Sequence, residues 1–394
     1  MTKNRHLSRR SAAACATLVA LFAATGCGSS DEKSSTSGAG GGPGVEAAKA
    51  RVAELMKPTT KYEPPGPALE NVKSLSGKTV WYIPITEKVE FFQAVTSGLK
   101  TALGKAGVNL RTCSGEANPS ATAACVNQAV EAKAGAIVLD AIPIAVAAQA
   151  FEGAKAKKIP VLVTDQNPPP PGAPGGVKGI GDSKLAYAPF GAEDLMRGVA
   201  DWIIADSNGK ANVLVAELTD SPSTQAWIQE GAVAEYEKNC PGCKVTVAKI
   251  NIASLQLVPS KISSELLRNQ DVDYVQPQFD AVAQPIQQGV QQAGFANKVK
   301  AASATGLLSG LQQVKQGGFI KADMAIDYAY QGWAIADEAF RMMLGEPPVE
   351  EKIPQRLFTK ENIGSIELTK EAEASGEWFG STEFRDMFTK LWGL

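Results

Sequence analysis

The side chains of this sequence that could take part in chemistry are carboxylates, amides and aromatic rings, because its 394 residues include a single histidine, His6. Ser-His or Cys-His nucleophile pairs and histidine-based metal sites cannot be assembled in the chain beyond it. Gly-Lys-Thr at 77–79 matches half of a phosphate-binding loop, but Val72 stands at its first glycine and the motif precedes a strand. We therefore expect a binding protein without cofactor or metal; a carboxylate-based enzyme stays open until turnover is tested.

Groups of polar and aromatic residues follow the strands that the sequence predicts. The first strand, 79–85, is an almost continuous apolar and β-branched run, typical of a strand covered on both faces. In a parallel sheet the carboxyl ends of the strands meet at one edge, and ligands bind there. The groups expected at this edge are residues 86–92, 114–118, 140–142 and 165–167.

Short apolar runs alternate with helical periodicity along both halves of the chain. The predicted strands are 79–85, 108–112, 136–140, 160–165, 211–218, 244–251, 273–276, 298–302, 322–326 and 355–358. The predicted helices are 91–103, 120–133, 145–157, 187–205, 223–239, 260–268, 281–293, 310–316 and 331–344. This alternation indicates βαβ units, and so an α/β fold with two doubly wound parallel-sheet lobes.

Size and charge restrict the partners. A chain of 394 residues exceeds one ordinary core, and 44% hydrophobic with 20% charged residues is typical of a soluble globular protein. A net charge of −2 provides no basic face for nucleic acid. A DNA-binding regulator with a two-lobed body would need a helix-turn-helix ahead of Lys78, and the Gly/Ser-rich stretch there offers none.

Residues 1–26 have the pattern of a secretory signal: a basic head, an apolar run over 12–24 and small residues before Cys27. The apolar run is too short to span a bilayer as a helix. Residues 24–27 resemble a bacterial lipobox, which implies a lipid on Cys27 that anchors the protein outside the bacterial cell membrane. Residues 27–77, rich in Gly, Ser and then Pro, are expected to be a flexible tether and spacer that includes a short helix over 45–56. Folded structure is expected to begin near Lys78.

Apart from the cysteines of the signal and the lipobox, four remain, and an even number in an exported chain favours disulfides. Cys113 and Cys125 flank a loop that can bring them together, and Cys240 and Cys243 enclose a Pro-Gly turn. A redox CxxC would open a helix after a strand, and a zinc site would need nitrogen ligands or more sulfur. We therefore expect two structural disulfides.

Two α/β lobes, a tether and a lipidated cysteine together resemble the type I periplasmic binding proteins of the ribose and galactose cluster, which serve ABC importers. The resemblance covers residues 78–358, and its most specific pieces are 82–93, 136–139 and 159–165. It implies a three-segment hinge. The implied division is 78–183 plus 327–350 for the first lobe, 184–326 plus 351–363 for the second, and 364–394 for a C-terminal tail docked on the body.

The resemblance also implies ligand-binding residues. One of the rings Phe91 and Phe92 would stack on a sugar ring, and Asp165 would serve as an acceptor-only carboxylate for paired hydroxyls. The full implied set is Thr86, Glu87, Phe91, Phe92, Asp165, Gln166, Ser221, Trp227, Gln278, Asp280, Thr305, Asp327 and Tyr328.

The sequence departs from the sugar binders of this family. Gln166 stands where Arg is usual, Phe279 replaces Asn, and Thr305 stands where a carboxylate is common. Fewer charges and more aromatic surface fit a less hydroxylated or partly apolar ligand as well as a sugar. The resemblance implies a monomer that hands a small molecule to an ABC permease; a ligand-sensing lipoprotein without a transport role stays open.

Overall fold

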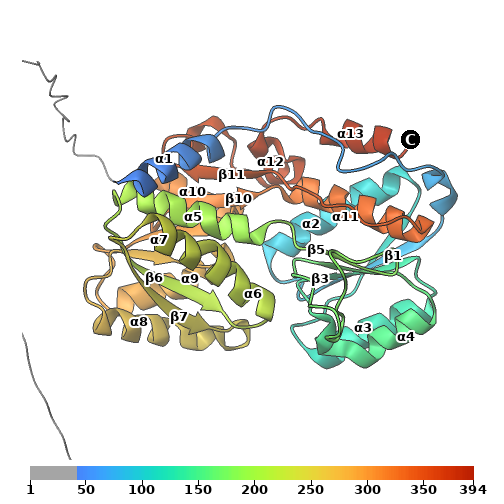
Figure 1. The fold of residues 1–394 in the computed structure, drawn as a ribbon, viewed down its shortest axis with the longest axis horizontal. Coiled ribbons are helices and arrows are strands. Elements are labelled where there is room, and N and C mark those ends of the chain that lie inside the picture. The colour runs from blue at the N-terminus through green and yellow to red at the C-terminus, as the bar shows by residue number, and fades with distance from the viewer. Residues whose placement is uncertain (1–41) are drawn as a thin grey trace, which may run out of the picture. The chain divides into compact units, whose positions relative to one another are not determined.

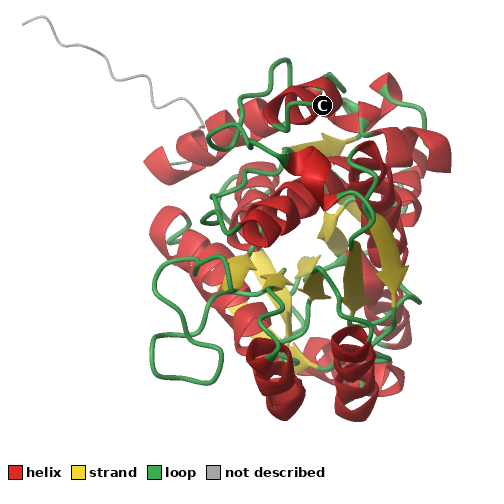
Figure 2. Ribbon diagram, turned by 90° about the vertical axis from the view of Figure 1, so that its right-hand side faces the viewer, coloured by secondary structure: helices red, strands yellow, loops and turns green. Residues whose placement is uncertain are grey.

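The computed structural model describes residues 42–394. The predicted signal peptide, Cys27 and the first part of the predicted tether lie outside the described residues. Residues 42–394 form two α/β lobes, each with a central sheet between helices (Figure 1, Figure 2). The predicted α/β fold with two parallel-sheet lobes is confirmed.

The first lobe is built on an all-parallel sheet with the strand order β2-β1-β3-β4-β5. Its strands are β1 (Thr79–Pro84), β2 (Asn109–Thr112), β3 (Ala136–Asp140), β4 (Val161–Thr164) and β5 (Leu185–Ala188). Every residue of β3 and β4 is buried, as expected for strands covered on both faces. One face packs on α3 (Pro119–Glu131), the turn η2 (Ile144–Ala147) and α4 (Ala148–Ala156), and the other on α2 (Glu90–Lys105).

Helix α2, which the sequence predicts over 91–103, packs on the sheet through an apolar stripe. Val95, Leu99 and Leu103 are fully buried there. The stripe begins at Phe92, which is 6% exposed, and not at Phe91, which is half-buried. Because successive helix residues point about 100° apart, only one of the two rings can face the core squarely.

The second lobe has the strand order β11-β10-β9-β8-β6-β7, parallel except for the pair β10 and β11. Its strands are β6 (Asn212–Leu218), β7 (Lys244–Ile250), β8 (Tyr274–Gln276), β9 (Lys300–Thr305), β10 (Ile320–Ile326) and β11 (Gln355–Thr359). Its helices are α5 (Ala192–Asp206), α6 (Pro222–Ala226), the π-helical η3 (Trp227–Val233), α7 (Ala234–Asn239), η4 (Ile252–Leu257), α8 (Val258–Arg268), α9 (Asp280–Gln292) and α10 (Leu308–Gln316).

The chain passes between the two sheets at three places. It leaves β5 for α5 over residues 189–191, β10 for α11 (Tyr328–Leu344) at Asp327, and α11 for β11 over 345–354. Helix α11 packs along α2, and β11 pairs with β10 at the edge of the second sheet. Three backbone segments therefore connect the lobes, and a hinge motion between the lobes would bend the chain at these segments.

The prediction of one helix over 187–205 is wrong at its start. Leu185–Ala188 form β5 beside β4, so these four residues belong to the first sheet and not to the second lobe. Pro189 and Phe190 lie between the strand and the helix, and α5 begins after Gly191, whose φ is +74°. The apolar run Leu185–Ala188 has only four residues, and so short a pattern does not distinguish an edge strand from the first turn of a helix.

Folded structure begins well before Lys78, so the expectation of a flexible spacer is wrong for the described residues ahead of it. Helix α1 (Pro43–Leu55) packs along α5. Its Arg51 forms ion pairs with the buried carboxylates of Asp201 and Glu235. This long-range pairing leaves no local sequence signal.

The Pro-rich stretch after α1 and the turn η1 (Val72–Leu75) lie against the C-terminal tail, which contains the turns η5 (Ile363–Ser365) and η6 (Glu377–Phe379) and the helices α12 (Lys370–Ser375) and α13 (Phe384–Leu391). Backbone N–H groups of Thr59 and Leu69 donate to the carbonyls of Phe379 and Leu391 at 2.6 and 2.8 Å. The ring of Trp392 stacks on Trp333 of α11 at 5.5 Å between centroids. Both ends of the described chain are thus packed on its body.

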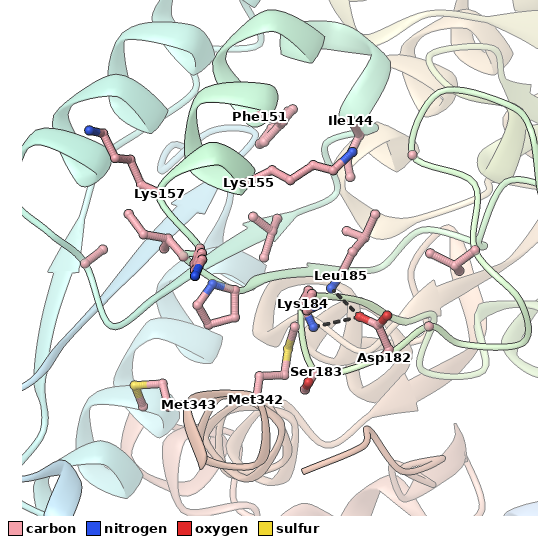
Figure 3. Close-up of a pocket in the computed structure, with 18 of the residues that line it drawn as sticks. Ile144, Phe151, Lys155, Lys157, Asp182, Ser183, Lys184, Leu185, Met342 and Met343 are labelled. Atoms are coloured by element: carbon pink, nitrogen blue, oxygen red, sulfur yellow. Dashed lines mark hydrogen bonds between the residues drawn. The ribbon is translucent and has the colours of Figure 1, made fainter. Parts of the chain in front are cut away.

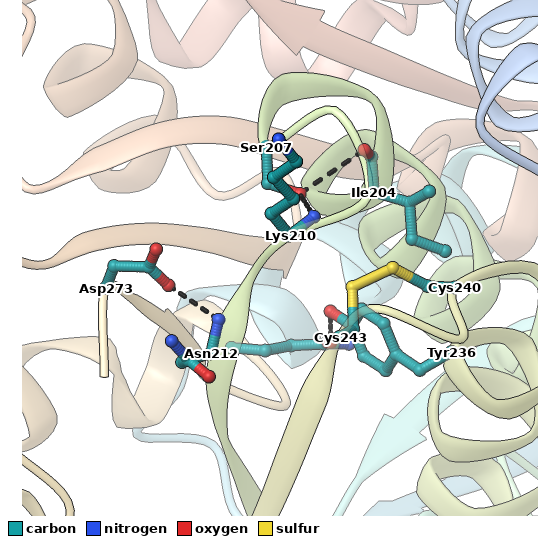
Figure 4. The surroundings of a disulfide bond; sticks show 9 residues. Ile204, Ser207, Lys210, Asn212, Tyr236, Cys240, Cys243 and Asp273 are labelled. Atoms are coloured by element: carbon teal, nitrogen blue, oxygen red, sulfur yellow. Dashed lines mark hydrogen bonds between the residues drawn. A yellow bond between two sulfur atoms is a disulfide. The ribbon is translucent and has the colours of Figure 1, made fainter. Parts of the chain in front are cut away.

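Both predicted disulfides are confirmed. Cys113 and Cys125, with Cα atoms 5.7 Å apart, join the end of β2 to α3. Cys240 and Cys243, 5.3 Å apart, close the turn between α7 and β7 (Figure 4). Within residues 42–394, none of the helices has the length and apolar character needed to cross a membrane.

Candidate functional site

A cavity of about 280 Å³ lies where the carboxyl ends of strands from both sheets converge. The first lobe lines it with the loops after β1, β3 and β4 and with the start of α2. The second lobe lines it with the loops after β6, β8 and β9 and with the start of α5. The cavity therefore lies at the edge that the strand-end rule indicates for ligands.

A larger hollow of about 1860 Å³ lies elsewhere on the first lobe (Figure 3). Its lining includes Lys78, Gly135, Pro160 and Lys184, which precede β1, β3, β4 and β5. It therefore lies at the amino edge of the sheet. Since ligands of open parallel sheets bind at the carboxyl edge, the smaller cavity is the candidate site.

Most residues of the predicted ligand-binding set line this cavity. They come from loops far apart in the sequence and belong to both lobes. The predicted residues in its lining are Thr86, Phe91, Phe92, Asp165, Gln166, Ser221, Trp227 and Thr305.

Gln278 and Asp280 do not line the cavity but hold the loops that do. The Gln278 side chain accepts from the Leu218 N–H at 2.7 Å and donates to the Thr224 carbonyl at 2.8 Å. Asp280 accepts from the Leu307 N–H at 2.8 Å. The prediction that they contact ligand is therefore corrected: in this structure they position residues 218–224 and 305–307.

The remaining predicted residues also lie outside the lining. Glu87 is exposed on the loop after β1. Asp327 is the N-cap of α11, where its side chain accepts from the Tyr330 N–H at 3.0 Å. Tyr328 is 3% exposed and donates its hydroxyl to the Thr305 carbonyl. Helix capping and loop bracing account for Asp327 and Tyr328.

Aromatic rings from both lobes border the cavity. The Phe91 ring meets Phe92 and Tyr328 edge to face, at 4.7 and 5.1 Å between centroids. In the second lobe Trp227 and Phe279 lie 6.2 Å apart. Such rings offer flat apolar surface for C–H groups while leaving polar groups of a ligand free to hydrogen-bond.

Asp165 shares its surroundings with a second carboxyl, Asp140, at the end of β3. The hydroxyl of Tyr82 donates to Asp140, and the Gln331 amide donates to Asp165 Oδ2 at 2.8 Å. Burial and then the neighbouring Asp140 raise the pKa of Asp165 well above its usual range, and burial also raises the pKa of Asp140. The raised pKa favours the neutral carboxyl of Asp165, which can donate as well as accept, so the acceptor-only role stays a prediction.

Several lining residues have a left-handed backbone although they are not glycine. The φ angles are +57° at Ala141, +52° at Asp165, +55° at Phe190 and +103° at Thr305. Such conformations cost about 1–3 kcal/mol each and persist where the surroundings fix them, as at ligand sites. Their concentration around one cavity is a second mark of a functional site.

The loop after β4 is bonded to the second lobe across the cavity. Asn167 accepts from the Trp227 indole N–H at 2.9 Å, and its backbone N–H donates to Ser223 Oγ at 2.9 Å. The Asn167 amide also donates to Glu193 of α5 at 3.0 Å. These contacts hold the two lobes together around the cavity.

Other lining residues were absent from the predicted set. Asn118 and Ile142 fall in the groups 114–118 and 140–142 that follow predicted strands, so the strand-end rule alone could have added them. Phe190 follows β5, which was not predicted. Leu307 follows β9, whose end was predicted at 302 and lies at Thr305.

The chain was compared with protein-family models, curated proteins and solved structures. A family model described as periplasmic binding protein domain matches residues 80–347. A search of curated proteins found no match.

Solved structures share the fold at low sequence identity. A solute-binding protein from Agrobacterium vitis bound with α-D-tagatopyranose has 19% identity and a TM-score of 0.64, with 73% of this chain and 96% of that chain covered. The glucose-galactose binding protein GanP of Geobacillus stearothermophilus has 17% identity and a TM-score of 0.62, covering 72% and 98%.

A 5-methylthioribose-binding protein from Thermotoga lettingae has 15% identity and a TM-score of 0.64, covering 79% of this chain and 96% of that chain. Identities this low support the likeness of fold alone. The family match, which spans more than half of the residues, together with the two-lobed architecture shows that the chain belongs to the periplasmic binding protein family and has its type I fold.

Proposed function

We propose that this protein is an extracytoplasmic solute-binding lipoprotein that captures a small, uncharged, partly apolar molecule, such as a sugar bearing an apolar group, and delivers it to an ABC importer. The observation that carries the proposal is the cavity between the carboxyl edges of two sheets, lined by both lobes. No chemical change of the ligand is part of the proposal.

The lining supports an uncharged ligand. Among the described residues, no lysine, arginine or histidine lines the cavity, and its two acids are Asp165 and Asp220. Burial raises the pKa of Asp165, and the carboxylate of Asp220 accepts from the Ile252 N–H at 3.1 Å. An anionic ligand would therefore lose its hydration without finding an opposite charge, and a cationic ligand would meet only the exposed Asp220.

The lining also supports a partly apolar ligand. Phe91 and Trp227 offer ring surface from opposite lobes, while Gln166, which is 3% exposed, adds a buried amide able to donate and accept. Convergent rings with a few polar groups are the usual composition of small-molecule sites. In this proposal the rings contact the carbon skeleton and Gln166 and Asp165 bind hydroxyls.

Contacts that exist only when the lobes are closed supply the means of capture. Asn167 bonds to Trp227 and Ser223 across the cavity. A ligand that touches both lobes binds the closed state better than an open one, and so shifts the population toward it. The signal at 1–26 and the lipid on Cys27 would place this receptor beside its permease.

A thermal-shift screen across neutral sugars, deoxy and alkylthio sugars, polyols and small aromatic compounds tests the proposal, followed by calorimetry on the best ligand. Phe91→Ala should weaken binding at least tenfold. Phe295→Ala, a half-buried ring on the second lobe outside the cavity, is the matched control and should leave affinity unchanged. Equal affinity of the Phe91→Ala protein and the wild type would contradict this site.

Delivery and anchoring need their own test. Cys27→Ala should release the protein from the membrane fraction and abolish labelling by radioactive palmitate. Uptake of the identified ligand by cells should then fall, whereas ligand affinity in calorimetry stays the same. Undiminished uptake after deletion of the gene would contradict the delivery role.

A further inference from the structure

Three carboxylates outside the cavity meet between α11 and the last crossing of the chain. Asp337 and Glu338 lie in the second half of α11, and Glu351 lies on the segment 345–354 that leads to β11. One oxygen from each lies within 4.8 Å of the others. Asp337 is 0% and Glu338 1% exposed, and Glu351 is half-buried.

Two members of the cluster are held in place by neighbouring groups. Asp337 pairs with Arg341 at 2.7 Å and accepts from the Trp392 indole N–H at 2.6 Å. Glu338 Oε1 accepts from the Val349 N–H at 2.9 Å. Such outer contacts orient carboxylates around a metal in known sites.

Several oxygens of the cluster have no partner among the described residues. They are Glu338 Oε2 and both carboxylate oxygens of Glu351, all buried from solvent. Buried polar atoms without a partner destabilise the fold, and more strongly when they are charged. Native proteins rarely leave three such atoms side by side, which points to a group that occupies the space between them.

The charges of the cluster do not balance. Three carboxylates face one guanidinium, that of Arg341, whose Nη2 donates to the Pro67 carbonyl at 3.1 Å. If all are ionised, the group carries a net charge of −2.

We propose that Asp337, Glu338 and Glu351 bind a divalent cation, with Ca²⁺ as the favoured ion. All donors are carboxylate oxygens, the ligands of hard cations, and neither nitrogen nor sulfur belongs to the cluster. Glu351 can bind through both oxygens, which Ca²⁺ accepts and Mg²⁺, with its strict octahedral geometry, accepts poorly. A charge of +2 cancels the net charge of the group.

The position of this site gives the cation a structural task. It joins α11, which packs on the first lobe, to the crossing that leads into the second sheet. The cation would fix the start of segment 345–354 relative to α11. The proposed cation site lies outside the solute cavity and does not depend on the function proposed for that cavity.

Calorimetry and thermal unfolding of the full-length protein, stripped with EDTA, test the proposal with CaCl₂ and MgCl₂. Ca²⁺ at about 100 times Kd should raise the unfolding midpoint by about 3–6 °C, and Mg²⁺ should raise it less. Glu338→Gln and Glu351→Gln should abolish the Ca²⁺ effect. Glu350→Gln, which removes one exposed charge at the neighbouring position, is the matched control and should retain it.

Glu351→Asp keeps the charge and shortens the side chain, so it should fold and bind Ca²⁺ about tenfold more weakly or worse. Two results would overturn the proposal. One is the absence of Ca²⁺ binding to the wild-type protein at millimolar concentration, in which case protons alone neutralise the cluster. The other is a Ca²⁺ shift of equal size in the wild type, Glu338→Gln and Glu351→Gln proteins, which would place the ion elsewhere.

Discussion

Asn167 of the first lobe accepts a hydrogen bond from the indole N–H of Trp227 in the second lobe, at 2.9 Å. The two residues are 60 positions apart and reach each other across the solute cavity. Because the bond joins the two lobes, it would break if the lobes separated, so it should report on the closure that we propose for ligand binding.

Replacing Trp227 by Phe keeps a ring in the cavity and removes the donor. We expect about fivefold weaker ligand binding, because one neutral hydrogen bond contributes about 1 kcal/mol to the closed state. Stopped-flow measurement should show the loss in a faster dissociation rate. Trp378→Phe removes an equivalent indole bond to the Glu367 carbonyl away from the cavity, and should leave ligand affinity as it is.

Asp165→Asn should change the pH dependence of stability. The pKa of Asp165 is raised in the folded protein. The contribution of this carboxyl to the free energy of unfolding is therefore fully present below its pKa in the unfolded chain, and is lost as the pH rises through its pKa in the folded protein. The variant removes this loss and should be the more stable protein at alkaline pH. Urea titrations from pH 5 to 9 check this, and parallel curves for both proteins would contradict a raised pKa of Asp165.

Asp327→Asn keeps an oxygen for the Tyr330 N–H and removes a titrating group. Burial raises the pKa of Asp327 to about 7. The contribution of this carboxyl to the free energy of unfolding of the wild-type protein therefore declines as the pH rises from about 4 through 7. The variant should show a flatter profile of unfolding free energy over that range. Unaltered pH dependence would show that Asp327 titrates as a solvated acid.

Arg51→Ala should loosen α1 from the second lobe. Asp201, with a side chain 2% exposed, would lose its ion pair, and Glu235, 6% exposed, would keep only the Asn239 amide and Arg197 at 4.0 Å. We expect a loss of about 2 kcal/mol in unfolding free energy, between the values for surface and buried pairs. Lys49→Ala, which removes an exposed pair on the same helix, is the control and should cost less than about 0.5 kcal/mol.

The two disulfides should differ in value. Cys113 and Cys125 are 12 positions apart, and their replacement by Ala should lower the unfolding free energy by about 3 kcal/mol. Cys240 and Cys243 are 3 positions apart, so their disulfide removes less conformational entropy from the unfolded chain. Replacing both by Ala should therefore lower the unfolding free energy by about 2 kcal/mol or less. Chemical denaturation of the two double variants orders them.

The sequence by itself determined the alternation of strands and helices and the edge at which a ligand would bind. Both follow from local patterns: the runs at Thr79–Pro84 and Ala136–Asp140 must be covered on two faces, and polar groups directly after strands share one edge. The disulfides were equally local, since loop length and cysteine count sufficed. These features depend on residues near one another in the chain.

Only the tertiary structure decided which of the candidate side chains face the cavity. Gln278 and Asp280 bond to backbone at 218–224 and 307, and strand β5 exists because β4 lies beside it. The packing of α1 on α5 and the meeting of Glu338 with Glu351 likewise join parts of the chain without a common pattern. Burial and charge balance are properties of the whole packed molecule, and a linear pattern carries neither.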